Sequence, residues 1–513
     1  MKREEDGTRV EGISLSLLEN QCDIVEIRSP STGEDLQNRL SSLIKKYQLP
    51  ALSEISLNEK SAYEVALIGS ISSKRAAVIL DRNGLAVAMD PLMSSVYTGV
   101  LGGFLILALD EKNPSGSSAE GVQDSRSIGL FAKLPVLDPS SMEEVREMIK
   151  DGFALSEKFQ IPVLMRLSHH LTYTQGSPKG ISLQPWRRET LFAKNPQRWA
   201  ATPRFRFLLH VELNKKLKEI AGFFETLGKP LSARLKKVSQ RNFGIISCGA
   251  TTPLVEGVLS DLGLNEQIPV LKIGTTHPLP KKKVEGFVSE FNRILVLESP
   301  LPALEIQMDH RKKVMGKLNG IVPLTGELSR EGLASLLLPL LVSIGILSEK
   351  TSQKKKGTTK IAPSGKEKSS CHLLIDRVQK AFPKAMVTGD HPEQVFCALD
   401  SSSSINLAAG IYQAFHQDGR IPPVIAVTEG EAFFHSGISA LVNAVYNRAR
   451  FILLILDGMG RGEEIARIVR GCGISQCEMV SSKNHPILLK RMREALHGPG
   501  GKEEEIAAFI LKA

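Results

Sequence analysis

Two glycine-containing turns near the C-terminus contain the residue types best suited to bind a ligand. Glu429-Gly430-Glu431 follows an apolar segment expected to be a strand (424–427), and Asp457-Gly458 follows a leucine-rich one (451–456). Ligands bind at the carboxyl ends of parallel strands in sheets of this kind. Carboxylate oxygens there are the ligands that a hard cation such as Mg²⁺ takes, whereas glycine offers none. The turns therefore predict a ligand site in which two positions lack a side-chain oxygen.

The segment after Asp457 has two interpretations. Gly458-Met459-Gly460-Arg461-Gly462 joins a predicted strand to a predicted helix, so its backbone amides could hold a phosphate group. Its spacing differs from the dinucleotide-binding fingerprint. A simple glycine turn between strand and helix explains the same residues.

Acidic, histidine and cysteine residues elsewhere are weaker candidates. Glu59 opens a predicted helix, where a carboxylate could do acid–base chemistry or only complement the helix dipole. His169-His170 follow a predicted strand with no third ligand in view, so no metal site is expected there. Cys472 and Cys477 cannot by themselves ligate a four-iron cluster, and we interpret them as structural thiols.

The elements that position these residues are expected to form three α/β blocks. Residues 1–185 alternate predicted strands (22–27, 76–80, 103–109, 161–166) with predicted helices (36–46, 59–70, 142–159). A basic and aromatic connector follows at residues 186–240, and the alternation restarts in residues 241–347. A flexible linker rich in Lys, Ser and Gly (348–370) then leads to the last block, residues 371–513. Strand–helix alternation at this spacing predicts the α/β class, with three doubly wound, mostly parallel sheets.

Composition favours a cytoplasmic globular protein. Of the 513 residues, 42% are hydrophobic and 23% are charged. The longest apolar run, 333–347, is too short to span a bilayer and contains Pro339 and Gly345. The net charge of +10 is concentrated in lysine runs without interleaved aromatic residues, so no nucleic-acid partner is expected. Six scattered cysteines and a charged N-terminus indicate reduced thiols and no signal peptide.

Five segments, in this order, resemble one family. They are Asn58-Glu59-Lys60 with 62–70, then 83–92 (NGLAVAMDPL), Gln123-Asp124-Ser125-Arg126, 271–280 (LKIGTTHPLP), and Phe433-Phe434-His435-Ser436-Gly437 with 443–447 (NAVYN). Each segment is weak alone. Together they resemble the large (alpha) subunit of indolepyruvate:ferredoxin oxidoreductases, a family of thiamine diphosphate-dependent 2-oxoacid oxidoreductases, along nearly the whole chain.

The resemblance implies a fold and a set of site residues. Residues 1–185 resemble the domain that binds the pyrimidine ring of thiamine diphosphate, 371–513 the diphosphate-binding domain, and 241–347 the transketolase C-terminal type of domain. Glu59 matches the family glutamate that faces the pyrimidine, and Thr32 a threonine on the substrate side. The positions matching the diphosphate and Mg²⁺ side are Glu429, Gly430, Glu431, His435, Asp457 and Gly458.

The resemblance also implies a reaction and partners. The reaction is the oxidative decarboxylation of aryl pyruvates to acyl-CoA, a step of amino-acid catabolism with an iron–sulfur protein as electron acceptor. The implied partners are a small beta-type subunit and an external ferredoxin, in an oligomer. The family's C-terminal ferredoxin-like segment has no counterpart, so no iron–sulfur cluster is expected in this chain.

The departures from the family pattern fall on the metal side. The family has aspartate where Gly430 stands and asparagine where Gly458 stands. Glu429 or Glu431 could replace the lost ligand, although extra carboxylates repel a diphosphate. Three hypotheses stay open: a working oxidoreductase subunit, a non-catalytic paralogue that acts as a structural or regulatory partner of an active subunit, and a pocket rebuilt for another small phosphorylated ligand.

Overall fold

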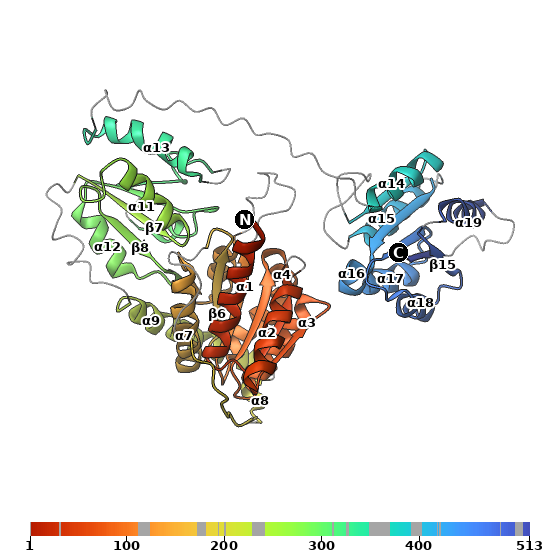
Figure 1. Cartoon of the computed structure of the whole chain (residues 1–513), viewed down its shortest axis with the longest axis horizontal. Coiled ribbons are helices and arrows are strands. Elements are labelled where there is room, and N and C mark those ends of the chain that lie inside the picture. Colours follow the sequence, from red (N-terminus) through yellow and green to blue (C-terminus); the bar gives the residue numbers. More distant parts are fainter. Residues whose placement is uncertain are drawn as a thin grey trace. The chain divides into compact units, whose positions relative to one another are not determined.

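The chain forms three mostly parallel sheets in two compact units. The computed structural model describes residues 2–29, 32–110, 124–171, 181–192, 194–199, 202–227, 242–309, 312–324, 328–347, 370–390, 403–417, 419, 422–482, 484–497 and 506–512. The units are Met1–Ile361 and Ala362–Ala513 (Figure 1). Within the described residues, the first unit contains two sheets and the second contains one.

The first sheet has the order β2-β1-β3-β4-β6-β5-β9. Its strands are β1 (Ile24–Arg28), β2 (Leu52–Ile55), β3 (Ala76–Asp81), β4 (Phe104–Asp110), β5 (Val136–Leu137), β6 (Val163–Ser168) and β9 (Thr275–His277). All neighbours pair in parallel except β5 and β9. The central strands are apolar and almost completely buried, as expected for a parallel sheet covered by helices on both faces.

Helices cover both faces of this sheet. One group consists of α1 (Lys2–Glu19), α2 (Gly33–Tyr47) and α7 (Met142–Phe159), and α1 lies beside α2 (Figure 1). The other consists of α3 (Glu59–Ile71), α4 (Arg82–Val87), α5 (Met89–Thr98) and α6 (Ser125–Ala132), with α8 (Pro196–Trp199) and α9 (Pro203–Phe224) further out. The chain leaves β1 toward one face and β3 toward the other. The carboxyl ends of these neighbouring strands therefore form a topological switch point, where ligands bind in such folds.

The second sheet has the order β11-β10-β7-β8, all parallel. Its strands are β7 (Phe243–Cys248), β8 (Val270–Ile273), β10 (Arg293–Leu297) and β11 (Val314–Met315). The accompanying helices are α11 (Thr251–Asp261), α12 (Lys281–Glu290), η2 (Glu305–Gln307) and α13 (Arg330–Ser343). Strand β9 leaves this block and becomes the antiparallel edge of the first sheet.

A buried ionic cluster also ties the second sheet to the first. The guanidinium of Arg126 is 1% exposed and contacts Asp124 Oδ2 at 2.5 Å and Glu298 Oε2 at 3.0 Å. Asp124 and Arg126 belong to the first block, whereas Glu298 follows β10. Burial raises the pKa of Glu298 to about 6, although the neighbouring Arg126 opposes the rise. Residues 1–185 and 241–347 are thus joined by hydrogen-bonded charges.

The third sheet has the order β12-β13-β14-β16-β15, all parallel. Its strands are β12 (Met386–Gly389), β13 (Val424–Glu429), β14 (Ile452–Asp457), β15 (Cys477–Ser481) and β16 (Ala507–Lys512). Helices α15 (Ser404–Gln417), α17 (Ile438–Tyr446) and α18 (Gly462–Gly471) bury one face, and α14 (Ser370–Ala381) and α19 (His485–His497) bury the other (Figure 1). The short α16 (Gly430–Ala432) and the π-helix η4 (Phe433–Gly437) precede α17.

The predicted fold class is confirmed: the chain is α/β with several mostly parallel sheets. The domain limits stay predictions, and residues 348–369 of the expected linker lie outside the described residues. The helix predicted over 142–159 has the observed bounds of α7. Helix α1, the edge strand β2 and the short β5 were not predicted. No helix in the described ranges is long and apolar enough to cross a membrane.

Candidate functional site

Glu59 lies at the switch point of the first sheet. It is the first residue of α3 and only 5% exposed. Its Oε1 is 3.6 Å from Nε of Arg28, the last residue of β1. Gly84 in α4 also approaches closely, since a Cβ there would lie 2.7 Å from Glu59 Cγ. Two segments, the end of β1 and the start of α4, therefore lie against this side chain.

Glu59 does not cap α3, but it lies in the first turn, where a carboxylate complements the helix dipole, so that alternative stays open. The cap is Asn58, whose Oδ1 accepts from the amides of Lys60 at 2.9 Å and Ser61 at 3.3 Å. A side-chain oxygen at this position satisfies the first amides of a helix. Because Asn58 already supplies that oxygen, the buried carboxylate of Glu59 is not needed for the same purpose.

Thr32 lies in the turn after β1, at the carboxyl end of the sheet. It precedes α2, its side chain makes no capping hydrogen bond, and its hydroxyl is 3.3 Å from that of Ser29. The neighbouring Ser31 lies outside the described residues. Thr32 and Glu59 thus follow adjacent strands, β1 and β2, at the same edge of the first sheet.

The turn after β13 is packed tightly at its glycine. Glu429 ends the strand, and Gly430 is buried. A Cβ on Gly430 would lie 3.3 Å from the carbonyl oxygen of Leu456 and 3.4 Å from Cδ1 of Ile465. The position that carries an aspartate in the resembled family is therefore crowded, and a side chain there would require the Leu456 carbonyl to shift slightly.

Glu431 and His435 lie in the helical segment after this turn. Glu431 belongs to α16 and His435 to the π-helix Phe433–Gly437. π-Helices are rare in proteins, and those that occur are often found at functional sites. The guanidinium of Arg461 lies 4.4 Å from the ring centre of Phe434, which connects this segment to the turn after β14.

Asp457 closes the turn after β14. Its Oδ1 accepts from the amide of Arg461 at 2.8 Å, and its Oδ2 accepts from the amide of Gly462 at 2.7 Å. The side chain is buried, whereas a Cβ on Gly458 would meet no atom within 4 Å. Because Asp457 occupies these two amides at the start of α18, the structure favours the simple-turn interpretation over a phosphate cradle.

Asp390 was not predicted as a site residue, yet it lies at the same edge of the third sheet. Its Oδ2 accepts from the hydroxyl of Thr428 at 2.8 Å and the amide of Glu429 at 3.1 Å. Burial raises the pKa of Asp390 to about 6, against the opposing effect of these hydrogen bonds. The Gly389-Asp390 pair after a strand was visible in the sequence, but its partners lie 38 and 39 residues away. The following residue, His391, lies outside the described residues.

The described residues contain no cluster of three or more His, Cys, Asp or Glu side chains suited to a metal ion. His169 and His170 stack on each other with ring centres 3.8 Å apart. Cys477 is buried and Cys472 half-buried, and burial raises the pKa of both thiols. The interpretation of Cys472 and Cys477 as structural thiols stays a prediction.

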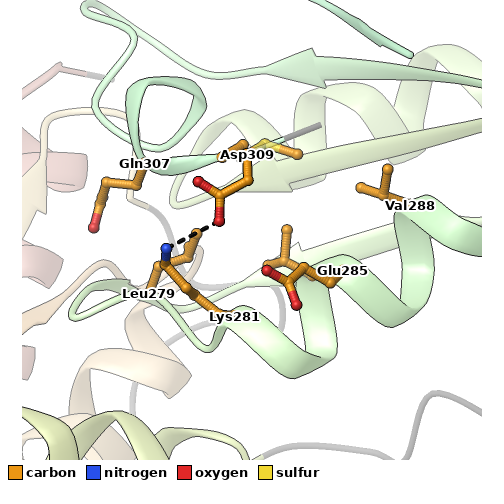
Figure 2. Close-up of a pocket in the computed structure, with 8 residues that line it drawn as sticks. Leu279, Lys281, Glu285, Val288, Gln307 and Asp309 are labelled. Carbon is orange, nitrogen blue, oxygen red and sulfur yellow. Dashed lines mark hydrogen bonds and ion pairs between the residues drawn. The ribbon is translucent and has the colours of Figure 1, made fainter. Parts of the chain in front are cut away.

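A small notch in the second-sheet block contains none of these residues. It is lined by apolar side chains, including Leu279, Val284 and Val288, beside an ion pair of 3.1 Å between Lys281 and Asp309 (Figure 2). Its cavity volume of about 10 Å³ suits one water molecule at most. It is too small for a substrate or a cofactor.

Similar sequences place the chain among the subunits of oxidoreductases. It is 30% identical to indolepyruvate oxidoreductase subunit IorA of Archaeoglobus fulgidus, over 97% of this chain and 86% of that protein. It is 28% identical to the protein of the same name from Methanothermobacter marburgensis, over 93% of this chain and 81% of that protein. No protein-family model matches the sequence. The chain belongs to the IorA family of indolepyruvate oxidoreductase subunits, which confirms the resemblance found in its motifs.

Solved structures show weaker likenesses. A 2-oxoglutarate:ferredoxin oxidoreductase from Magnetococcus marinus aligns over 64% of each chain, with a TM-score of 0.47 and 14% identity. A split-gene transketolase aligns over 66% of this chain and 97% of its own, with a TM-score of 0.39 and 13% identity. Likenesses of this size do not define the function, which depends on the residues of the site.

Proposed function

We propose that the chain is the alpha-type subunit of a 2-oxoacid:ferredoxin oxidoreductase that acts on indolepyruvate and related aryl pyruvates. Membership of the IorA family supports this proposal. The structural observation that carries it is the buried Glu59 at the switch point, enclosed by Arg28 and Gly84 and not used as a helix cap.

The residues of the first sheet fit the pyrimidine side of thiamine diphosphate. Glu59 would face the pyrimidine ring, and Thr32 would lie on the substrate side. When bound, thiamine diphosphate supplies the carbanion-stabilising chemistry of the decarboxylation. In this proposal the acyl group passes to coenzyme A and the electrons to an external ferredoxin, with a small beta-type subunit completing the enzyme.

The residues of the third sheet do not fit a bound Mg²⁺ in the family's manner. Gly430 and Gly458 provide no side-chain oxygen, and Asp457 is occupied by two backbone amides. Of the predicted positions, Glu429 and Glu431 carry the remaining carboxylates. We therefore derive no catalytic step through the metal. This half supports a second candidate function, a non-catalytic paralogue that regulates or stabilises an active subunit.

The proposed cytoplasmic oligomer has one supporting surface. Val65 and Ile68 on the outer side of α3 are 45% and 49% exposed, in the helix that begins with Glu59. Apolar side chains in such positions are typical of contact surfaces between subunits. Light scattering coupled to size-exclusion chromatography, alone and with the small subunit, measures the assembly directly.

The deciding experiment is a calorimetric titration of the protein with thiamine diphosphate and Mg²⁺, with and without the small subunit. Micromolar binding, followed by indolepyruvate-dependent reduction of ferredoxin, supports the oxidoreductase. Binding that requires Mg²⁺ and is lost in both Glu429→Gln and Glu431→Gln assigns the metal to these carboxylates. Absence of binding in both conditions rejects the catalytic proposal and leaves the paralogue.

A further inference from the structure

Arg28 is a buried cation at the switch point. It ends β1, is 7% exposed, and lies directly before the Ser29–Thr32 turn. Arginine is almost never buried without a partner, because the removal of its charge from water is costly. Glu59 is one carboxylate paired with it, at 3.6 Å between Nε and Oε1, and both side chains are less than 10% exposed.

The Arg28–Glu59 pair is longer than the shortest buried arginine pairs of the first sheet and equals the 3.6 Å pair of Arg166 with Asp138. Arg126 and Arg166 hold Asp124 and Asp110 by hydrogen bonds of 2.5 Å, which fix those carboxylates firmly. The 3.6 Å between Arg28 and Glu59 is longer than a hydrogen bond. Arg28 therefore lies within ion-pair distance of Glu59 and compensates its charge.

Glu59 is also bounded by rigid structure. Gly84 is buried and its amide donates to Asp81 Oδ1 at 2.5 Å, so the turn that carries it is fixed by its own cap. A buried carboxylate that packs against backbone and is attracted by a guanidinium is restricted in its orientation. Preorganisation of this kind improves binding because less conformational freedom is lost when a ligand arrives.

We propose that Arg28 is a positioning residue for Glu59: its charge holds the carboxylate in the orientation that receives an aminopyrimidine ring. This inference rests on the proposed function, since it assumes that Glu59 faces the pyrimidine. It extends that function to a residue outside the matched motifs. Arg28 acts through Glu59 and has no reacting role of its own.

The experiment compares Arg28→Met, Arg28→Lys, Glu59→Gln and the Arg28→Met/Glu59→Gln double variant with the wild type. Arg75→Met is the matched control, because Arg75 forms a half-buried pair with Glu157 at 2.6 Å just before β3, at the opposite end of the sheet. The probes are thiamine diphosphate and the fragment 4-amino-5-hydroxymethyl-2-methylpyrimidine, titrated by NMR. The fragment reports on the pyrimidine side without any contribution from diphosphate or metal.

We expect Arg28→Met to weaken fragment binding about tenfold or more. Arg28→Lys should restore part of that loss, and Arg75→Met should not change binding. In the Glu59→Gln background, Arg28→Met should have no further effect, because the carboxylate that it positions is gone. Unchanged fragment affinity in Arg28→Met, or an equal loss in both backgrounds, overturns the inference while leaving the proposed function in place.

If the wild type binds neither probe, the proposed function itself is rejected. A second measurement then tests whether Arg28 and Glu59 act together. Urea midpoints of the wild type, Arg28→Met, Glu59→Gln and the double variant form a double-mutant cycle that needs no cofactor. Non-additive midpoint shifts of Arg28→Met and Glu59→Gln support the electrostatic positioning of Glu59 by Arg28. Additive shifts show that the two residues act independently and overturn it.

Discussion

Replacement of Gly84 by alanine tests how tightly Glu59 is held. The new Cβ would lie 2.7 Å from Glu59 Cγ and 3.0 Å from Asp81 Oδ1. Overpacking of this kind costs about 1–3 kcal/mol. Alanine is a better helix former than glycine by about 1 kcal/mol, and Gly84 lies in α4, so this gain offsets part of the cost. We expect a net destabilisation of about 0–2 kcal/mol and a loss of fragment binding, because the carboxylate is displaced.

The matched control is Gly222→Ala in α9, where a Cβ would meet no atom within 4 Å. That variant should be stabilised by about 0.5–1 kcal/mol, the difference in helix propensity alone. Urea unfolding monitored by circular dichroism measures both variants. Because the closest clash is with Glu59 Cγ, Gly84→Ala should become neutral or stabilising in a Glu59→Ala background. The same cost in both backgrounds would refute the enclosure of Glu59 by Gly84.

Two further predictions concern the third sheet. Asp457→Ala removes the acceptor of the Arg461 and Gly462 amides and should cost about 1–2 kcal/mol in urea unfolding, as for other lost helix caps. The pKa of Asp390 is raised from 3.8 to about 6, so its contribution to stability is fully present below about pH 4 and is lost as pH rises through 6. Relative to Asp390→Asn, the free energy of unfolding of the wild type should therefore fall by up to about 3 kcal/mol between these pH values. A stability difference between the two proteins that does not change with pH would contradict the assigned pKa shift.

The sequence predicted elements whose signals are local. Helix α7 has the predicted bounds; in the structure Ser141 caps its start and Gln160, with φ of 50°, ends it in the left-handed region. The apolar strands β13 and β14 and their glycine turns were also predicted, because their apolar runs are continuous in the sequence. Helix α1 was missed because its charged first half resembles a tail. Strand β2 was missed because it is a short edge strand, mostly exposed and without a clear apolar alternation.

The parts of the site that could not be predicted depend on distant contacts. Nothing near Arg28 in the sequence indicates that its partner is Glu59, 31 residues further on. Asp390 depends in the same way on Thr428, and the antiparallel β9 on a block more than 130 residues earlier. Asp457 was predicted as a ligand-side residue. That role stays a prediction; the structure adds that its oxygens accept hydrogen bonds from backbone amides of the following turn, which only the turn geometry reveals.

Restoration of the metal side requires more than the return of its ligands. Gly458→Asn meets no steric obstacle, but an aspartate at 430 would crowd Cδ1 of Ile465 and the carbonyl of Leu456. Ile465→Val deletes that Cδ1 at a cost of about 0.5–1.5 kcal/mol, so the Gly430→Asp/Gly458→Asn/Ile465→Val variant provides both ligands and relieves the side-chain contact, while the 3.3 Å approach to the Leu456 carbonyl remains. We expect this variant to bind thiamine diphosphate with Mg²⁺ at least about tenfold more tightly than Gly458→Asn alone. The Gly430→Asp variant without Ile465→Val should gain less affinity and should unfold at a lower urea concentration. Equal affinity in the triple variant and the wild type, with the fold intact by circular dichroism, would mean that the two glycines do not limit cofactor binding.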